Sequence, residues 1–347
     1  MTARKRTLDR NKLRTQSVRG RRSKVGVLQE ASPCPPGASF SEFLETLPDV
    51  QGAADLRTVI DAWAAAWARK RMVIWGFGAH LIKVGLAPVV VDLMERGAIG
   101  ALMANGAVCV HDLELAMMGR TSEDVGPALD DGSFGMGRET AQHLNEAIAA
   151  GAEQGLGMGE SVGRAILEGG YPHRGRSVLA SAVRLEIPVT IHTAIGTDIH
   201  HMHASADGAA LGATSHRDFE TLIALVAGLQ EGVLFNVGSA VILPEVFLKA
   251  LSVARNLGHS VERLTTVDLD FVRHYRPRVN VVERPTRLGG RGISLVGHHE
   301  IMVPLLAAGV IEAQSGTPKR SKGKSSRRRA PPKGGSGSRS RGKRGRP

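Results

Sequence analysis

The feature that most constrains the fold is a regular alternation of short apolar segments with longer segments of helical periodicity. The short segments, which are typical of strands, lie at residues 72–75, 99–104, 187–192, 233–237 and 264–269. Strands that alternate with helices favour a parallel sheet covered by helices on its faces. We therefore predict an α/β fold with a mainly parallel sheet flanked by helices.

Apolar residues recur at helical spacing between these strand segments. They predict two helices within 40–70, one over 80–96 and further helices over 137–155, 158–168, 176–186, 218–229 and 244–257. Residues 121–136 are rich in Gly, Asp and Ser and indicate an irregular loop. Trp63 and Trp67 lie four residues apart, which predicts that both pack on one helix face toward the core.

The net charge of +12 comes from the two ends of the chain. Residues 1–24 hold ten Lys or Arg and one acid, and residues 315–347 hold thirteen Lys or Arg and no acid. Subtracting these from the totals of 45 basic and 33 acidic residues leaves 22 basic and 32 acidic residues in residues 25–314, so the body of the chain is acidic. We expect a basic disordered arm and linker over 1–38, an α/β domain over 39–313 and a basic disordered tail over 314–347.

Basic ends bind polyanions without sequence preference, so these ends are expected to contact nucleic acid or another polyanion. The alternative is a pair of solvated arms with no dedicated partner. No apolar run reaches the length of about 18 residues that a membrane span needs, and no apolar signal segment follows the basic N-terminus. These features predict no membrane span and a cytoplasmic location. Cys34 and Cys109 are the only two cysteines, too few for a cysteine-based zinc site.

The stretch 75–114 predicts a ligand-binding crevice. Its first apolar segment ends in a glycine turn at Gly78, and its second breaks at Asn105 and Gly106 before another helical segment. Ligands bind at the carboxyl ends of parallel strands, where the first turn of a helix offers free N–H groups to a phosphate. A plain strand-to-helix turn that needs small residues is the alternative.

Five segments of the chain follow one another in a characteristic order. They are GFGAHLIKVGL, MERGAIGALMANGAVCVHD, IPVTIHTAIGTD, LFNVGSAV and GHHEIMVPLLAAG. This order resembles the deoxyhypusine synthase family in its bacterial, synthase-like branch, over about residues 40–313. The resemblance implies a Rossmann-like NAD-binding fold and a homotetramer. It also implies a reaction in which NAD takes a hydride from a polyamine and an enzyme lysine carries the aminobutyl group.

The resemblance also implies positions for the site. The cofactor-binding residues would be Gly78, Ala79, His80, Lys83, Asn105, Gly106, Gly238 and His299. The residues predicted to act in catalysis, mainly by handling protons, are His111, Asp112, His201 and His298, and those predicted to bind substrate are Asp198 and Glu245. Two simpler roles stay open: Glu245 as a carboxylate favoured in the first turn of a helix, and Lys83 as a solvated helix residue.

One departure from the family concerns its catalytic lysine, which should lie upstream of GHHEIMVPLL. No lysine occurs between Lys249 and Lys319. An arginine cannot form the imine, because its guanidinium stays protonated. The sequence therefore predicts an NAD-dependent transferase or oxidoreductase that acts on a polyamine-like or other small amine, rather than true deoxyhypusine synthesis.

A competing prediction starts from the histidines, since six of the thirteen lie in two short runs, 192–203 and 298–299. Imidazole and carboxylate are donors that zinc accepts. The two candidate ligand sets are Asp198, His201 and His203, and His298, His299 and Glu300. This pattern would suit a metal-dependent hydrolase or lyase, although a polar pocket without metal is preferred over zinc. A polyanion-binding protein that acts through its basic ends is the third alternative.

Overall fold

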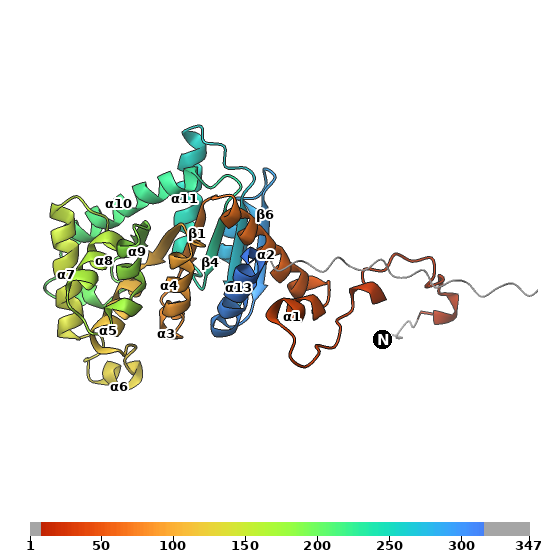
Figure 1. Ribbon diagram of the computed structural model, residues 1–347, viewed down its shortest axis with the longest axis horizontal. Coiled ribbons are helices and arrows are strands. Elements are labelled where there is room, and N and C mark those ends of the chain that lie inside the picture. The colour runs from red at the N-terminus through yellow and green to blue at the C-terminus, as the bar shows by residue number, and fades with distance from the viewer. Residues whose placement is uncertain (1–7, 316–347) are drawn as a thin grey trace, which may run out of the picture.

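The computed structural model describes residues 8–315 (Figure 1). Its six strands are β1 (Val73–Phe77), β2 (Ala101–Asn105), β3 (Val189–His192), β4 (Val233–Val237), β5 (Thr265–Asp270) and β6 (Arg291–Val296). All neighbouring strands pair in parallel, in the order β3-β2-β1-β4-β5-β6. The predicted α/β fold with a parallel sheet is confirmed, and this strand order is the Rossmann-like one.

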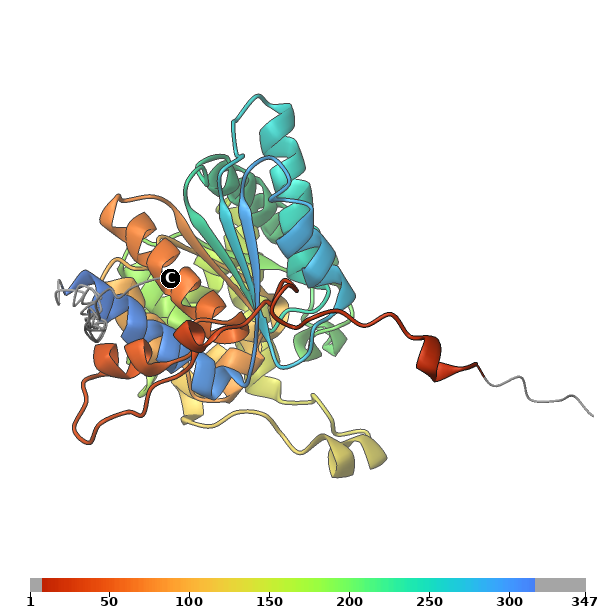
Figure 2. The same ribbon diagram turned by 90° about the vertical axis from the view of Figure 1, so that its right-hand side faces the viewer.

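Helices cover both faces of the sheet. They are α1 (Phe40–Thr46), α2 (Gln51–Ala68), α3 (His80–Lys83), α4 (Ala87–Glu95), α5 (Gly106–Met118), α6 (Val125–Asp130), α7 (Arg138–Glu153), α8 (Met158–Glu168), α9 (Val178–Arg184), α10 (Gly208–Ala227), α11 (Ile242–Asn256), α12 (Tyr275–Pro277) and α13 (His299–Gln314). Short turns of helix lie at η1 (Arg10–Lys12), η2 (Val27–Gln29), η3 (Arg174–Arg176), η4 (Ile199–Met202) and η5 (Arg278–Glu283). In Figure 2, α2 and α13 lie on one side of the sheet and α11 lies on the other.

The core follows from the alternation of side chains along β1 and β4. Trp75 and Phe235 face α2, where their rings lie 5.3 and 4.8 Å from the ring of Trp63. The Trp63 indole N–H donates to the carbonyl of Ala98 at 2.8 Å, so this buried ring leaves no polar group unpaired. Ile74 and Leu234 point to the other face, against α10 and α11. The predicted core positions of Trp63 and Trp67 are confirmed, with Trp63 fully buried and Trp67 packed against the core.

Several element boundaries differ from the prediction. The helix predicted over 80–96 is two helices, because the chain turns at Gly85 with a φ of +80°. The loop predicted over 121–136 contains α6, and α10 begins at Gly208 behind the cap of Asp207 rather than at residue 218. The prediction lacked β6, an edge strand in which only Ile293 and Leu295 are buried.

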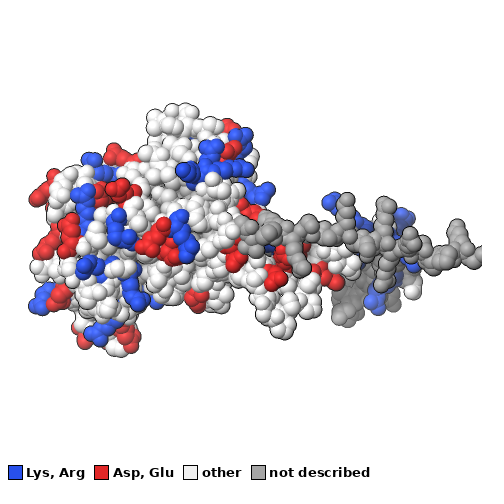
Figure 3. Space-filling model, in the orientation of Figure 1, with Lys and Arg blue, Asp and Glu red and all other residues white. Residues whose placement is uncertain are grey.

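The basic ends lie mostly outside this fold. Residues 1–7 and 316–347 fall outside the described residues, so the predicted tail over 314–347 is not described beyond its first two residues. Residues 8–28 are exposed, and the first contacts to the body come at Gln29, whose backbone carbonyl accepts from the N–H of Asp49 at 3.0 Å. On the face shown in Figure 3, acidic and basic side chains of the body are interspersed. Between residues 8 and 315, no helix has both the length and the apolar character needed to cross a membrane.

The buried carboxylate of Asp218 in α10 connects α8 to β3 through hydrogen bonds. Its protonation is expected to make the stability of the protein depend on pH. Its buried carboxylate accepts from the N–H groups of Gly159 and Ile191 at 2.9 and 2.7 Å, and burial raises its pKa from 3.8 to about 7. At a pH between 3.8 and about 7, Asp218 keeps its proton in the folded state and releases it on unfolding. The stabilisation present at low pH is therefore lost as the pH rises through about 7. We expect the urea midpoint of the wild type to fall between about pH 5 and 8 relative to that of Asp218→Asn. Equal pH slopes for the two proteins would contradict this expectation.

Candidate functional site

The floor of the candidate site is formed by two glycine turns at the carboxyl edge of the sheet. Gly78 follows β1 and Gly238 follows β4, and these strands are neighbours where the strand order reverses. A Cβ on Gly78 would lie 3.0 Å from the carbonyl oxygen of Gly238, so the two backbones meet without side chains between them. Such a reversal point opens a crevice in which nucleotides bind in folds of this class.

The first half of the site is a group of rings beside Gly238. His299 is buried, its Nε2–H donates to the carbonyl of Leu269 at 3.1 Å, and its ring lies 5.4 Å from that of His80. Since Nε2 carries the proton, Nδ1 holds a lone pair, and no described residue pairs with it. Burial lowers the pKa of His299, which keeps the ring neutral and Nδ1 an acceptor. The exposed rings of Phe271 and His298 stack nearby, 6.1 Å apart.

The second half of the site is a pair of adjoining cavities beside α5, of about 180 and 430 Å³. Lys83 from α3, His111 from α5 and Asp198 before η4 all line the smaller one. Four acidic and two basic residues line the pair together: Glu114, Glu123, Glu139, Asp198, Lys83 and Arg120. Because α3 carries both His80 and Lys83, this single turn of helix connects the two halves of the site.

His111 is held by a chain of hydrogen bonds. Its Nδ1 lies 2.7 Å from the hydroxyl of Thr121, which donates its only proton to Glu114. Nδ1 must therefore carry the proton in this pair, and Nε2 keeps the lone pair. Burial and the charge of Lys83 lower the pKa of His111 to about 4. At neutral pH His111 is thus an uncharged, oriented acceptor.

This chain gives a testable expectation for Thr121→Val, which removes the hydroxyl at nearly constant volume. Without its acceptor, His111 should lose its preference for the proton on Nδ1, measured from the ¹⁵N shifts of the ring. Thr140→Val is the matched control, because Thr140 also donates to Glu114, at 3.1 Å, but forms no hydrogen bond with His111. The same tautomer in wild type and Thr121→Val would contradict the expectation.

Asp112 has a different environment from its neighbour His111. Its fully buried carboxylate accepts from the hydroxyl of Ser177 at 2.5 Å and from the N–H groups of Val178 and Leu179 at 2.9 and 3.0 Å. These are the first residues of α9, so Asp112 caps that helix from α5. Adjacent residues on a helix point in different directions. The geometry therefore gives Asp112 a structural role. The predicted catalytic role required Asp112 to contact His111, and the structure does not bring these two side chains together.

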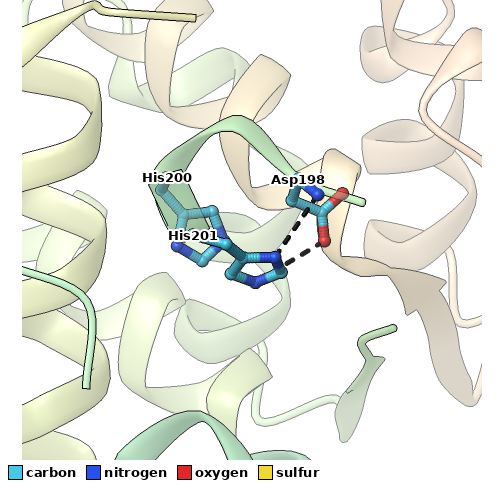
Figure 4. A group of neighbouring side chains, drawn as sticks. All are labelled: Asp198, His200 and His201. Carbon is cyan, nitrogen blue, oxygen red and sulfur yellow. Dashed lines mark hydrogen bonds and ion pairs between the residues drawn. The ribbon is translucent and has the colours of Figure 1, made fainter. Parts of the chain in front are cut away.

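The histidine run after β3 folds differently from the predicted ligand set. His203 turns away, and its Nε2–H donates to the carbonyl of Gly135 at 2.9 Å. His200 takes its place: Asp198, His200 and His201 offer ligand atoms that all lie within 4.8 Å of one another (Figure 4). The Asp198 carboxylate lies against the start of α5, where a Cβ on Gly106 would be 2.1 Å from its Oδ2. Burial raises the pKa of Asp198 to about 6.

The remaining predicted residues are spread around the edge. His298 is exposed, its Nδ1 lies 3.8 Å from Glu300, and His299 points the other way into the sheet, so the second predicted ligand set does not converge. Glu245 lies in the first turn of α11 and is held by Lys249, by Asn280 at 2.8 Å and by Arg276 at 3.4 Å. These contacts and its position in the first turn favour the simpler alternative, in which Glu245 is a structural carboxylate of that turn. Ala79 is buried, and Asn105 is the N-cap residue of α5.

Several polar residues of this edge were not predicted from the sequence. Thr121 and Glu114 orient His111, and Asn236 of β4 donates to the carboxylate of Asp268 in β5 at 2.9 Å. Asn236 and Asp268 could have been predicted from the sequence, because each places a polar side chain within an otherwise apolar strand segment. Thr121 could not, because it lies in a segment that gave only a loop prediction.

Unpaired buried polar atoms concentrate at this edge. Among the described residues, seven buried side-chain atoms have no hydrogen-bond partner: Trp75 Nε1, Asn105 Oδ1, Asp198 Oδ2, His200 Nε2, His201 Nε2, Asn236 Oδ1 and His299 Nδ1. All except Trp75 Nε1 lie at or beyond the carboxyl ends of β2, β3, β4 and β6. Since buried polar atoms are almost always paired, this clustering indicates a place where other molecules supply the partners.

Some proteins of known structure are similar to this chain in fold. No family model and no curated protein matches the chain. A conserved candidate LOR/SDH protein from Methanococcus maripaludis S2 shares 12% identity with a TM-score of 0.50, over 86% of this chain and 76% of that one. A candidate deoxyhypusine synthase from Entamoeba histolytica shares 10% identity with a TM-score of 0.49, over 82% and 96% of the two chains.

The cyanobacterial arginine dihydrolase ArgZ shares 17% identity with a TM-score of 0.46, and the match covers 76% of this chain. This chain spans about a third of the length of ArgZ, 33%. Identities this low show the fold alone. The similarity to the Methanococcus maripaludis protein, at a TM-score of 0.50, is therefore a similarity of fold.

Proposed function

We propose that this chain is an NAD-dependent transferase or oxidoreductase that acts on a small amine. The observation that carries the proposal is the concentration of unpaired buried polar atoms at the carboxyl edge, on both sides of the strand reversal. NAD carries phosphates, hydroxyl groups and an amide, so it offers many partners to such an edge. The strand order supports the same ligand class, because folds with this order bind dinucleotides at this place.

The cofactor would lie along the turns after β1, β2 and β4. Gly78, Ala79, Asn105, Gly106 and Gly238 would line the cofactor along these turns. His299 Nδ1 is an acceptor for a hydroxyl or amide, His80 offers an exposed ring beside it, and Lys83 offers a charge for a phosphate. NAD, when bound, would supply the acceptor for a hydride.

The substrate proposal rests on the charge of the two cavities. Glu114, Glu123, Glu139 and Asp198 outnumber the basic residues of the lining, which suits a substrate that carries ammonium groups. His111 would accept a proton at Nε2, with Thr121 and Glu114 holding its ring. His201, His298 and Glu245 remain predicted site residues whose roles depend on the substrate.

The family lysine has no counterpart at its expected place, and Lys83 is the one lysine among the cavity-lining residues. We therefore do not propose deoxyhypusine synthesis. Membership of the deoxyhypusine synthase family, a homo-oligomer and a cytoplasmic location stay proposals that derive from the resemblance and the composition. Light scattering of the purified chain would measure the oligomer directly.

The proposal is tested by supplying NAD with a panel of di- and polyamines and following NADH by its absorbance. We expect at least one amine to be oxidised to an imine with formation of NADH and release of a proton, and a loss of rate of about 10²- to 10⁴-fold in His111→Ala. Glu153→Ala, at an exposed position of α7, is the control and should keep the wild-type rate. A rate unchanged in His111→Ala would reject its role, and no product from any amine would reject the substrate class.

A further inference from the structure

We propose that Asp198 and His200 bind a divalent transition-metal ion such as Zn²⁺, with His201 holding a water ligand of that ion. The three side chains come together at the start of η4, beside the smaller cavity (Figure 4). Asp198 Oδ2, His200 Nε2 and His201 Nε2 are all buried, and none has a hydrogen-bond partner in the part of the chain that the structure describes. The three residues offer ligand atoms that lie within 4.8 Å of one another, and the unpaired polar atom that each one buries calls for a polar or ionic occupant.

His200 is prepared to act as a metal ligand. Its Nδ1 donates to the side-chain oxygen of Asn145 at 2.9 Å, and the orientation of Asn145 is fixed because its amide nitrogen donates to the His200 carbonyl at 3.1 Å and to Ser205 at 2.9 Å. With the proton on Nδ1, the lone pair of His200 is on Nε2, in a fully buried position. Histidines that bind metals show this arrangement, in which the second nitrogen donates to a fixed acceptor.

Asp198 supplies the second ligand. Its side chain is only 5% exposed, and Oδ2 points into the cluster without a donor from the described chain. Carboxylate and imidazole together suit Zn²⁺ and its neighbours in the transition series. Because Asp198 also lines the smaller cavity, the other coordination positions of the ion would be open to water or to a substrate.

His201 cannot coordinate the ion in this conformation. Its Nδ1 accepts from the backbone N–H groups of Gly196 at 3.1 Å and Asp198 at 3.3 Å. A neutral imidazole has one lone pair, so Nε2 carries the proton. That Nε2 lies 3.9 Å from Asp198 Oδ2, too far for a direct hydrogen bond. A metal-bound water or hydroxide between them would accept from His201.

The metal proposal does not rest on the proposed function, and the two make competing demands on Asp198. An ion bound there would neutralise the carboxylate and exclude an ammonium group from it. Metal binding is therefore measured on the full chain without NAD or amine, so failure of either proposal is seen separately.

The test is a titration of chelator-treated full-length protein with Co²⁺, followed by visible absorption, and with Zn²⁺, followed by calorimetry. We expect one ion per chain. Affinity should fall at least about tenfold in Asp198→Asn and His200→Gln, and by about 10- to 100-fold in Asn145→Ala, which removes the acceptor behind His200. His259→Ala, an exposed histidine outside the cluster, is the control for binding by surface imidazoles and should match the wild type.

His201→Ala separates the two roles that a histidine could have here. It should keep most of the affinity, because it removes a donor to water rather than a ligand. A loss as large as in His200→Gln would overturn the assigned coordination. Absence of stoichiometric binding in the wild type would overturn the site itself, whether or not the variants fold, and would mean that a water alone bridges the three atoms.

Discussion

Replacing Asp112 with alanine is expected to lower the free energy of unfolding by about 3 kcal/mol or more. The carboxylate is fully buried and accepts three hydrogen bonds, from the hydroxyl of Ser177 and from the N–H groups of Val178 and Leu179. Alanine would leave these donors buried and unpaired, and α9 would lose its cap from α5. Chemical unfolding followed by circular dichroism measures the change.

Two comparisons sharpen this test. Glu153→Ala removes an acid from the exposed end of α7 and should change stability by no more than about 0.5 kcal/mol. Asp112→Asn keeps one acceptor oxygen and should lie between alanine and wild type. If Asp112→Ala were as stable as the wild type, the capping role would be wrong, and a catalytic role for Asp112 would again be the favoured prediction.

Replacing Gly238 with alanine is expected to disturb both stability and cofactor binding. Gly238 has a φ of +70°, and a Cβ there would lie 2.5 Å from Cε1 of His299. The left-handed backbone costs about 1–2 kcal/mol for a non-glycine residue. Because His299 is buried and fixed by Leu269, its displacement adds a steric cost of about 1–3 kcal/mol.

Gly258→Ala provides the matched control for this variant. Gly258 also has a positive φ, of +90°, but an added Cβ would meet no atom within 4 Å. It should therefore show the backbone cost alone and leave NAD affinity unchanged, whereas Gly238→Ala should weaken NAD binding by at least about tenfold. Equal effects of the two substitutions on NAD binding would show that His299 and its turn take no part in the site.

Much of the fold was predictable because its causes are local. The apolar segments at 72–75, 99–104, 187–192, 233–237 and 264–269 each led to a strand, and their alternation with helices implied parallel pairing. The β6 strand was missed because it lies at the edge of the sheet, where only Ile293 and Leu295 need to be apolar.

The site was predictable in position but not in detail. The predicted parallel strands place Gly78, Gly106 and Gly238 at one edge of the sheet, because each of these glycines follows a strand. It did not reveal that the turn η4 points His200 toward Asp198 and turns His203 away, because that depends on the contact of His200 with Asn145, 55 positions earlier. Likewise, the contact of Asp112 with Ser177 spans 65 positions, which no local pattern encodes.

The most direct test of the central claim is a calorimetric titration of the full-length chain with NAD. The account predicts binding of one NAD per chain with a dissociation constant below about 1 mM, weakened in His80→Ala and Gly238→Ala and unchanged in Gly258→Ala. No heat of binding at millimolar NAD, in protein that is folded by circular dichroism, would contradict it.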